Sequence, residues 1–227
     1  MTRFKSVKLA LICNLAFTCI ASGNAILVYN TGESSGLTAL SIGQSNPNYN
    51  IVSAPSGVPL GAAITTAANP NWLQNTSTTD WISPGSSGLT NWAGGNYDYQ
   101  TTFSLAGLNP STAELTGSWA SDNGGCIYLN GTNTGNCTAA VGGFKSLVAF
   151  TITTGFQAGV NVLDFIVNNG ANSPTGVFID ISGTASSGVI LSPQVDPVPE
   201  PSAFPTLLGI GLVGFAAVFR HGRKSHA

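Results

Sequence analysis

The chain has 227 residues, enough for one ordinary domain, and it is 43% hydrophobic, only 7% charged and rich in glycine (28 residues), a composition typical of short strands joined by polar turns. Six of the seven basic residues lie near the two ends, so residues 26–199 hold one lysine against eight acids, a formal charge of −7. A nucleic-acid-binding protein needs a basic surface to displace counterions from phosphates, so this distribution excludes nucleic acid as a partner.

Residues 1–25 have the three parts of a secretory signal peptide. A basic start precedes an apolar stretch from residue 9 to about residue 20, and the small residues Gly23 and Ala25 occupy the −3 and −1 positions of a cleavage point after Ala25. The apolar stretch is shorter than the roughly 20 residues that a membrane-spanning helix needs, which favours a cleaved leader over an uncleaved anchor. A lipoprotein modified at Cys19 is an alternative, although Thr18 is larger than the residue that normally precedes a lipidated cysteine.

The body between the two ends has the periodicity of strands and no stretch with the 3.6-residue period of a helix. In residues 97–105, Tyr97, Tyr99 and Phe103 alternate with polar residues, which predicts a strand with one buried face. Further strands are predicted at residues 113–119, 160–167 and 177–181, and weaker ones at 26–29, 37–42, 50–52, 61–65, 126–129 and 147–153. We therefore predict an all-β domain over residues 26–195, an antiparallel β-sandwich or jelly roll, with a signal helix before it and a short transmembrane helix after it.

Cys126 and Cys137 are the only cysteines outside the leader. An exported protein meets oxidising conditions, and Asn130-Gly131 between the two cysteines is a tight-turn signal, so we predict a disulfide that closes a hairpin. A metal site or a reactive thiol is the alternative. The body has no histidine to complete a zinc site, which favours the disulfide.

Several turns and strands of the body resemble those of galactose-binding-like jelly-roll domains. They are Trp81-Ile82-Ser83-Pro84, the turn Leu129-Asn130-Gly131 and the strand Gly159-Val160-Asn161-Val162-Leu163-Asp164-Phe165. The resemblance covers about 100 residues and implies a fold more than a ligand, because these motifs encode turns and core positions.

The body offers little chemistry for catalysis. Both histidines, His221 and His226, lie in the tail, which excludes a nucleophile activated by histidine from the body. The eight acids are expected to be scattered over solvated positions, although two of them could in principle cleave a glycosidic bond. For binding, Trp72 and Trp92 lie in Asn-rich loops and are the candidates for glycan contact. No cofactor is expected apart from a structural Ca²⁺, for which Asp122 is a weak candidate ligand.

The C-terminal segment 196–227 has three parts of its own. Val198, Pro199, Glu200, Pro201 and Ser202 lead into an apolar stretch, and the basic residues Arg220, Arg223 and Lys224 follow it. A helix from residue 205 to residue 219 would be about 22 Å long, short for a hydrocarbon core of about 30 Å. This favours a transient stop in the inner membrane with the basic residues on the cytoplasmic side.

This tail resembles the PEP-CTERM sorting signal of exported proteins in Gram-negative bacteria that make extracellular polysaccharide. The resemblance implies an inner-membrane precursor, cleavage near Pro199-Glu200-Pro201 by an exosortase, and transfer to the cell surface or extracellular matrix. A plain single-span anchor is the alternative. We thus predict an exported, non-catalytic surface or matrix protein associated with exopolysaccharide or biofilm. The alternatives are a carbohydrate-binding module that recognises a specific glycan and an enzyme that uses two acids.

Overall fold

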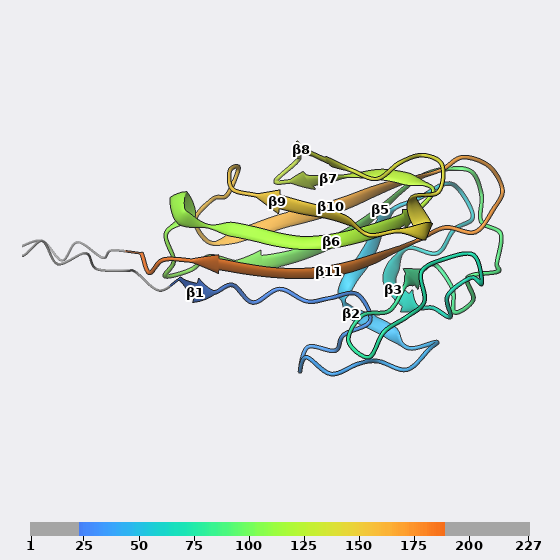
Figure 1. The fold of residues 1–227 in the computed structure, drawn as a ribbon, viewed down its shortest axis with the longest axis horizontal. Helices are drawn as coiled ribbons and strands as arrows, with labels where there is room; N and C mark the ends of the chain where they lie inside the picture. Colours follow the sequence, from blue (N-terminus) through green and yellow to red (C-terminus); the bar gives the residue numbers. More distant parts are fainter. Residues whose placement is uncertain (1–22, 189–227) are drawn as a thin grey trace, which may run out of the picture. The chain divides into compact units, whose positions relative to one another are not determined.

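The regular secondary structure of the body consists almost entirely of antiparallel strands (Figure 1). The computed structural model describes residues 23–188, and within them two 3₁₀ turns are the only helical elements. The elements are β1 (Asn24–Ala25), β2 (Ser45–Ser53), β3 (Gly61–Thr65), β4 (Ile82–Ser83), β5 (Gly95–Ser104), η1 (Pro110–Thr112), β6 (Glu114–Asp122), β7 (Gly124–Leu129), β8 (Thr132–Cys137), η2 (Gly143–Lys145), β9 (Val148–Ile152), β10 (Val160–Asn169) and β11 (Gly176–Ala185).

The strands form one continuous sheet that turns back on itself. Its order is β8-β7-β10-β5-β2-β3-β4-β11-β6-β9, with β1 added to β11, and every named pair is antiparallel. The long strands β5 and β10 pair over their whole lengths, from Val160 opposite Ser104 to Asn169 opposite Gly95. The predicted all-β sandwich of the jelly-roll kind is therefore confirmed.

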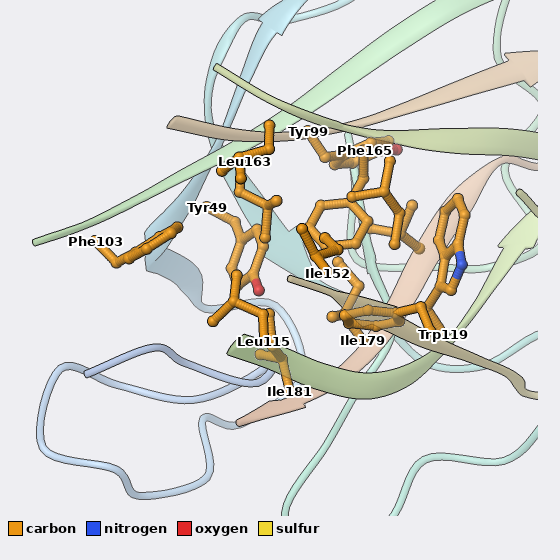
Figure 2. Packing of buried hydrophobic residues seen from close by; sticks show 14 of the residues in the cluster. Tyr49, Tyr99, Phe103, Leu115, Trp119, Ile152, Leu163, Phe165, Ile179 and Ile181 are labelled. Carbon is orange, nitrogen blue, oxygen red and sulfur yellow. The ribbon is translucent and has the colours of Figure 1, made fainter. Parts of the chain in front are cut away.

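The core lies between two layers of this sheet. One layer contains β7, β10, β5 and β2, and the other contains β11, β6 and β9. Trp119 of β6 meets Phe165 of β10 edge to face across the gap, with ring centroids 5.4 Å apart, and Tyr49 of β2 lies 6.4 Å from the same Phe165 ring (Figure 2). Because alternate residues of each strand point inward, the inner faces of both layers share one hydrophobic core.

The strands with the clearest period of two were predicted correctly. Residues 97–105, 113–119, 160–167 and 177–181 all fall mainly within β5, β6, β10 and β11. The predicted strands at 26–29 and 37–42 are wrong. Ile26 is buried beside β11, but residues 26–29 belong to no strand, and Leu37 has a positive φ of 59° in a turn and is 57% exposed. Ile42 is also 47% exposed, so the apolar residues of the second segment do not form the buried face of a strand.

A hairpin joins β7 to β8 at the turn that the sequence indicated. Leu129 pairs with Thr132, and the two residues between them, Asn130 and Gly131, both have positive φ, at 50° and 79°. This is the backbone that a two-residue hairpin with the twist of its strands requires, and asparagine followed by glycine adopts it most readily. Cys126 and Cys137 are opposite each other on these strands and form a disulfide, as predicted.

We expect the disulfide to stabilise the fold appreciably. Its cysteines are 11 residues apart, and closing a loop of this length in the unfolded chain corresponds to about 2–3 kcal/mol in the chain-entropy model. The double variant Cys126→Ser/Cys137→Ser should lose that much free energy of unfolding in urea. Reduction should destabilise the wild type and leave the variant unchanged, and equal stability of oxidised wild type and variant would contradict the prediction.

The described residues begin and end beside each other. Asn24 and Ala25 form β1 and pair with Ala185 and Thr184, so the predicted cleavage after Ala25 would remove β1 and leave the hydrogen bond from the Ile26 N–H to the Gly183 carbonyl. Within residues 23–188, no helix has the length and apolar character needed to cross a membrane. Most of the predicted signal helix and the whole predicted transmembrane helix lie outside these residues.

Candidate functional site

The side of β7, β10 and β5 that points away from the core is lined with polar and aromatic residues. We call it the outer face. The alternation that buries Tyr97, Tyr99 and Phe165 turns their neighbours outward. The pairing of the three strands then brings together the outward residues Tyr128 of β7, Asp164, Ile166 and Asn168 of β10, and Asn96, Asp98, Gln100 and Thr102 of β5.

One end of the outer face holds a hollow of about 460 Å³, which we call the Tyr128 hollow. Tyr128 and Ile166 supply an aromatic ring and an apolar side chain to its lining, and Asn96 and Asn168 supply amides. The Asn168 amide donates to the Asn96 carbonyl oxygen at 2.8 Å, and both residues are exposed. The hollow thus offers a half-buried ring beside amide donors and acceptors, a combination suited to polyhydroxylated ligands.

Two glycines shape the Tyr128 hollow. A Cβ at Gly124 would lie 2.7 Å from the Ala140 Cα, and a Cβ at Gly125 would lie 2.6 Å from the Ile166 carbonyl oxygen. Backbone atoms cannot move away as the end of a side chain can, so only glycine allows the 138–140 segment and β10 to approach so closely here. These neighbouring glycines therefore allow close packing. They do not form a phosphate-binding loop, because no lysine or helix follows them.

A second hollow, of about 250 Å³, lies further along the outer face and is called the Gln100 hollow. Asn50 of β2 and Gln100, Thr101 and Thr102 of β5 line it, together with Tyr29, Pro47 and Asn48. Asn96, Asp98, Gln100 and Thr102 are successive outward residues of one strand, so β5 connects the two hollows, with Asp98 between them.

Asp98 and Asp164 lie on neighbouring strands between the two hollows. Asp98 is opposite Ile166 and Asp164 is opposite Gln100, which makes the two carboxylates diagonal neighbours. The Gln100 amide donates to Asp164 Oδ1 at 2.8 Å, whereas Asp98 Oδ1 is buried and has no hydrogen-bond partner among residues 23–188. Burial first, and the negative charge of Asp164 second, raise the pKa of Asp98 to about 6. The expectation that no two acids lie together is therefore wrong for this pair.

The two tryptophans predicted to contact glycan do not form a surface platform. Trp72 is only 5% exposed and stacks at 4.4 Å from Trp81 in a small second cluster with Phe178 and Ala120. Trp92 is half-buried against the main core, and its indole N–H is enclosed with no partner among the described residues. The Asn-rich loops fold inward at these points because the large rings bury more apolar surface there than they would exposed. Tyr128, which is not among the predicted glycan contacts, is the aromatic residue that β7, β10 and β5 present on the outer face.

Asp122, the candidate Ca²⁺ ligand, is buried at the end of β6 and is 6% exposed. Its Oδ2 accepts a hydrogen bond of 2.8 Å from the Trp72 indole N–H. Among residues 23–188, no three His, Cys, Asp or Glu side chains gather in a group that could hold a metal ion. The hydrogen bond between Asp122 and Trp72 links the second aromatic cluster to the end of β6.

The burial of Asp122 predicts a dependence of stability on pH. Desolvation raises its pKa from 3.8 to about 6, although the hydrogen bond from Trp72 acts in the opposite direction. The folded protein then holds the proton more tightly than the unfolded chain, so this contribution to stability is full below pH 3.8 and is lost as the pH rises through about 6.

Replacing Asp122 with asparagine should weaken this pH dependence. Asparagine keeps an acceptor for Trp72 but carries no charge, so Asp122→Asn should lose less free energy of unfolding than wild type between about pH 5 and about pH 7.5. Urea unfolding at the two pH values measures the difference. Asp180→Asn removes the same charge from an exposed position and serves as the control. An equal pH slope in wild type and Asp122→Asn would contradict the prediction.

Comparison with known proteins bears on the C-terminal segment. Residues 197–224 match the family model of the PEP-CTERM protein-sorting motif. The chain carries a PEP-CTERM sorting signal. The match covers the proline-glutamate-proline sequence, the apolar stretch and the basic residues that the sequence analysis placed in 196–227, all of which lie outside the described part of the structure.

The PEP-CTERM motif establishes that the protein is exported and processed. A chain with this signal is an exported protein of a Gram-negative bacterium, and an exosortase processes it at the membrane. The exosortase is thus a partner of this chain, as predicted. The motif concerns sorting alone and assigns no task to the folded body.

Two further comparisons concern the rest of the chain. The comparison with curated proteins found no match. Among solved structures, it is similar to the CBM36-1 domain of a multidomain xylanase from the hindgut metagenome of Trinervitermes trinervoides, with 14% identity over 65% of this chain and 93% of that domain and a TM-score of 0.30. A likeness this distant says nothing of what the body of this chain binds.

Proposed function

We propose that the mature protein is a non-catalytic component of the cell surface or extracellular matrix and that it associates with exopolysaccharide. The PEP-CTERM motif is the observation that carries this proposal, because it marks the protein for export and extracellular polysaccharide accumulates outside the cell. The body is a β-sandwich cross-linked by a disulfide, and disulfides persist in the oxidising conditions outside the cell.

The polar character of the outer face supports association with a polysaccharide. It offers amide groups on exposed side chains and a half-buried tyrosine along paired strands, whose backbone is held rigid by the sheet. Rigid elements hold binding groups in place at a lower entropy cost than mobile loops do.

The proposal is tested by following the protein in cells. In a strain that makes exopolysaccharide, most of the processed protein should fractionate with the extracellular polymer, and in a strain that lacks polymer synthesis it should appear in the medium or in washes of the cells. Processed protein that fractionates identically in both strains would overturn the association with polysaccharide while leaving export intact.

The adjacent carboxylates Asp98 and Asp164 favour a second candidate function, hydrolysis of a glycan by two acids. The Cβ atoms of diagonal neighbours across antiparallel strands lie within about 7–8 Å of each other, which is close enough for both carboxyl groups to reach the same glycosidic bond. Asp164 is nearly buried and already accepts from Gln100, which suits a positioning role better than attack. Release of reducing ends from the polymer, lost in Asp98→Asn, would replace the non-catalytic proposal.

A further inference from the structure

Resting on the proposed function, we infer that the outer face of β7, β10 and β5 is the surface that contacts the polysaccharide and that it takes an uncharged chain rather than an acidic one. The first step is the shape of this face. The lining of the Tyr128 hollow includes outward residues of β7, β10 and β5. The Gln100 hollow combines outward residues of β2 and β5 with Thr101 and Tyr29, and β5 connects the two hollows.

The length of the connected surface suits a polymer. From Asn96 to Thr102 the chain advances six residues in an extended strand, about 20 Å at roughly 3.4 Å per residue. Every second side chain on this path points outward, and all four outward groups are polar. A polymer lying along β5 would meet amide, carboxylate, amide and hydroxyl groups in turn, whereas a single sugar would fill one hollow.

The side chains offer the two kinds of contact that sugars make. The Tyr128 ring is half-buried beside Ile166, so one side of a sugar ring can pack against an apolar surface. Asn96 and Asn168 are exposed and bonded to each other at 2.8 Å, which leaves each amide with free donors or acceptors for hydroxyl groups.

The charge of the face decides the class of polysaccharide. Asp98 and Asp164 lie between the hollows, and the only lysine in the body, Lys145, does not line either hollow. Placing a uronate or sulfate beside these carboxylates would add a like charge in a region already short of water. Hydroxyl groups, in contrast, add no charge, and they can form hydrogen bonds with the exposed amides of Asn96 and Asn168. The face therefore complements an uncharged polymer.

The test uses the processed protein purified from exosortase-positive cells and the exopolysaccharide of the producing strain, separated by anion exchange into uncharged and acidic fractions. Wild type should bind the uncharged fraction. Tyr128→Thr, which keeps a residue that favours strands but removes the ring, should weaken binding about five- to tenfold. Tyr128→Phe should retain binding, and Leu89→Ala serves as the control, because Leu89 is 66% exposed and lines neither hollow.

A double variant tests the preference for an uncharged polymer. Asp98→Asn/Asp164→Asn should raise the affinity for the acidic fraction several-fold and reduce the difference between the two fractions. Thermal unfolding checks that each variant is folded, and Asn168→Ala replaces Tyr128→Thr if that variant does not fold.

Three outcomes overturn the inference. They are wild-type binding only to the acidic fraction, binding unchanged in both Tyr128→Thr and Asn168→Ala, and binding to the acidic fraction unchanged by the double asparagine variant. Each is distinguishable from failure of the proposed function, which would appear as no binding of wild type to either fraction.

Discussion

Replacing Glu200 with alanine should stop the processing of the C-terminal tail. In exosortase-positive cells the wild-type chain is expected to lose its tail, whereas Glu200→Ala should accumulate as a longer precursor in the membrane fraction. The physical reason is local. Within the matched residues 197–224, Glu200 is the one charged side chain that precedes the apolar stretch, so alanine at this position removes the only charge of the proline-glutamate-proline sequence.

Immunoblotting of the membrane and extracellular fractions with an antibody to the body measures this effect. Ser202→Ala, at the edge of the same motif, removes only a hydroxyl group and is the matched control, with processing expected to continue. Equal processing of wild type and Glu200→Ala would contradict the role of Glu200. A wild-type chain that keeps its tail in these cells would contradict processing by exosortase.

The sorting signal could be predicted because its information is linear. Its three parts follow one another within about 30 residues, and each is recognised from the order and type of its residues alone. The same holds for the hairpin at Asn130-Gly131, where two neighbouring residues determine the turn and thereby place Cys126 opposite Cys137.

Strands were predictable where burial leaves a period of two. In β5 each inward tyrosine is followed by a polar outward residue, so the sequence records which face the core covers. β8 was missed because its sequence, Thr132–Cys137, contains no large apolar residue. It becomes a strand because the turn and the disulfide hold it against β7, and neither effect appears in hydrophobic periodicity.

The outer face could be predicted only in part. The alternation in Cys126-Ile127-Tyr128-Leu129 already turns Tyr128 away from the buried Ile127 and Leu129, so this signal was available in the sequence. The neighbourhood of Asp98 and Asp164 was not available, because it depends on the register of two strands that are distant in the chain. Trp72 was misplaced for a related reason, since its burial depends on Trp81 and Asp122 reaching it.

Replacing Trp119 with alanine should be among the most destabilising single changes in the body. Trp119 is fully buried in β6, between Ile179 of β11 and Val148 of β9, and its ring meets Phe165 of the opposite layer (Figure 2). Truncation removes the contact that joins the two layers and leaves a cavity, and large aromatic residues truncated in a core cost about 3–5 kcal/mol. That is a large share of the roughly 5–15 kcal/mol that stabilises an ordinary domain.

Trp119→Phe keeps an aromatic ring at this position but makes it smaller and removes the indole N–H. The indole N–H of Trp119 is buried with no partner among residues 23–188, so phenylalanine loses some packing but also removes an unsatisfied donor. We expect a loss of about 1–2 kcal/mol for Trp119→Phe, because the smaller ring still fills most of the site. Exposed Leu89→Ala should change stability by less than about 0.5 kcal/mol. Urea unfolding of the three variants gives the order, and a loss in Trp119→Ala no larger than in Leu89→Ala would mean that the two layers are held together without the Trp119–Phe165 contact.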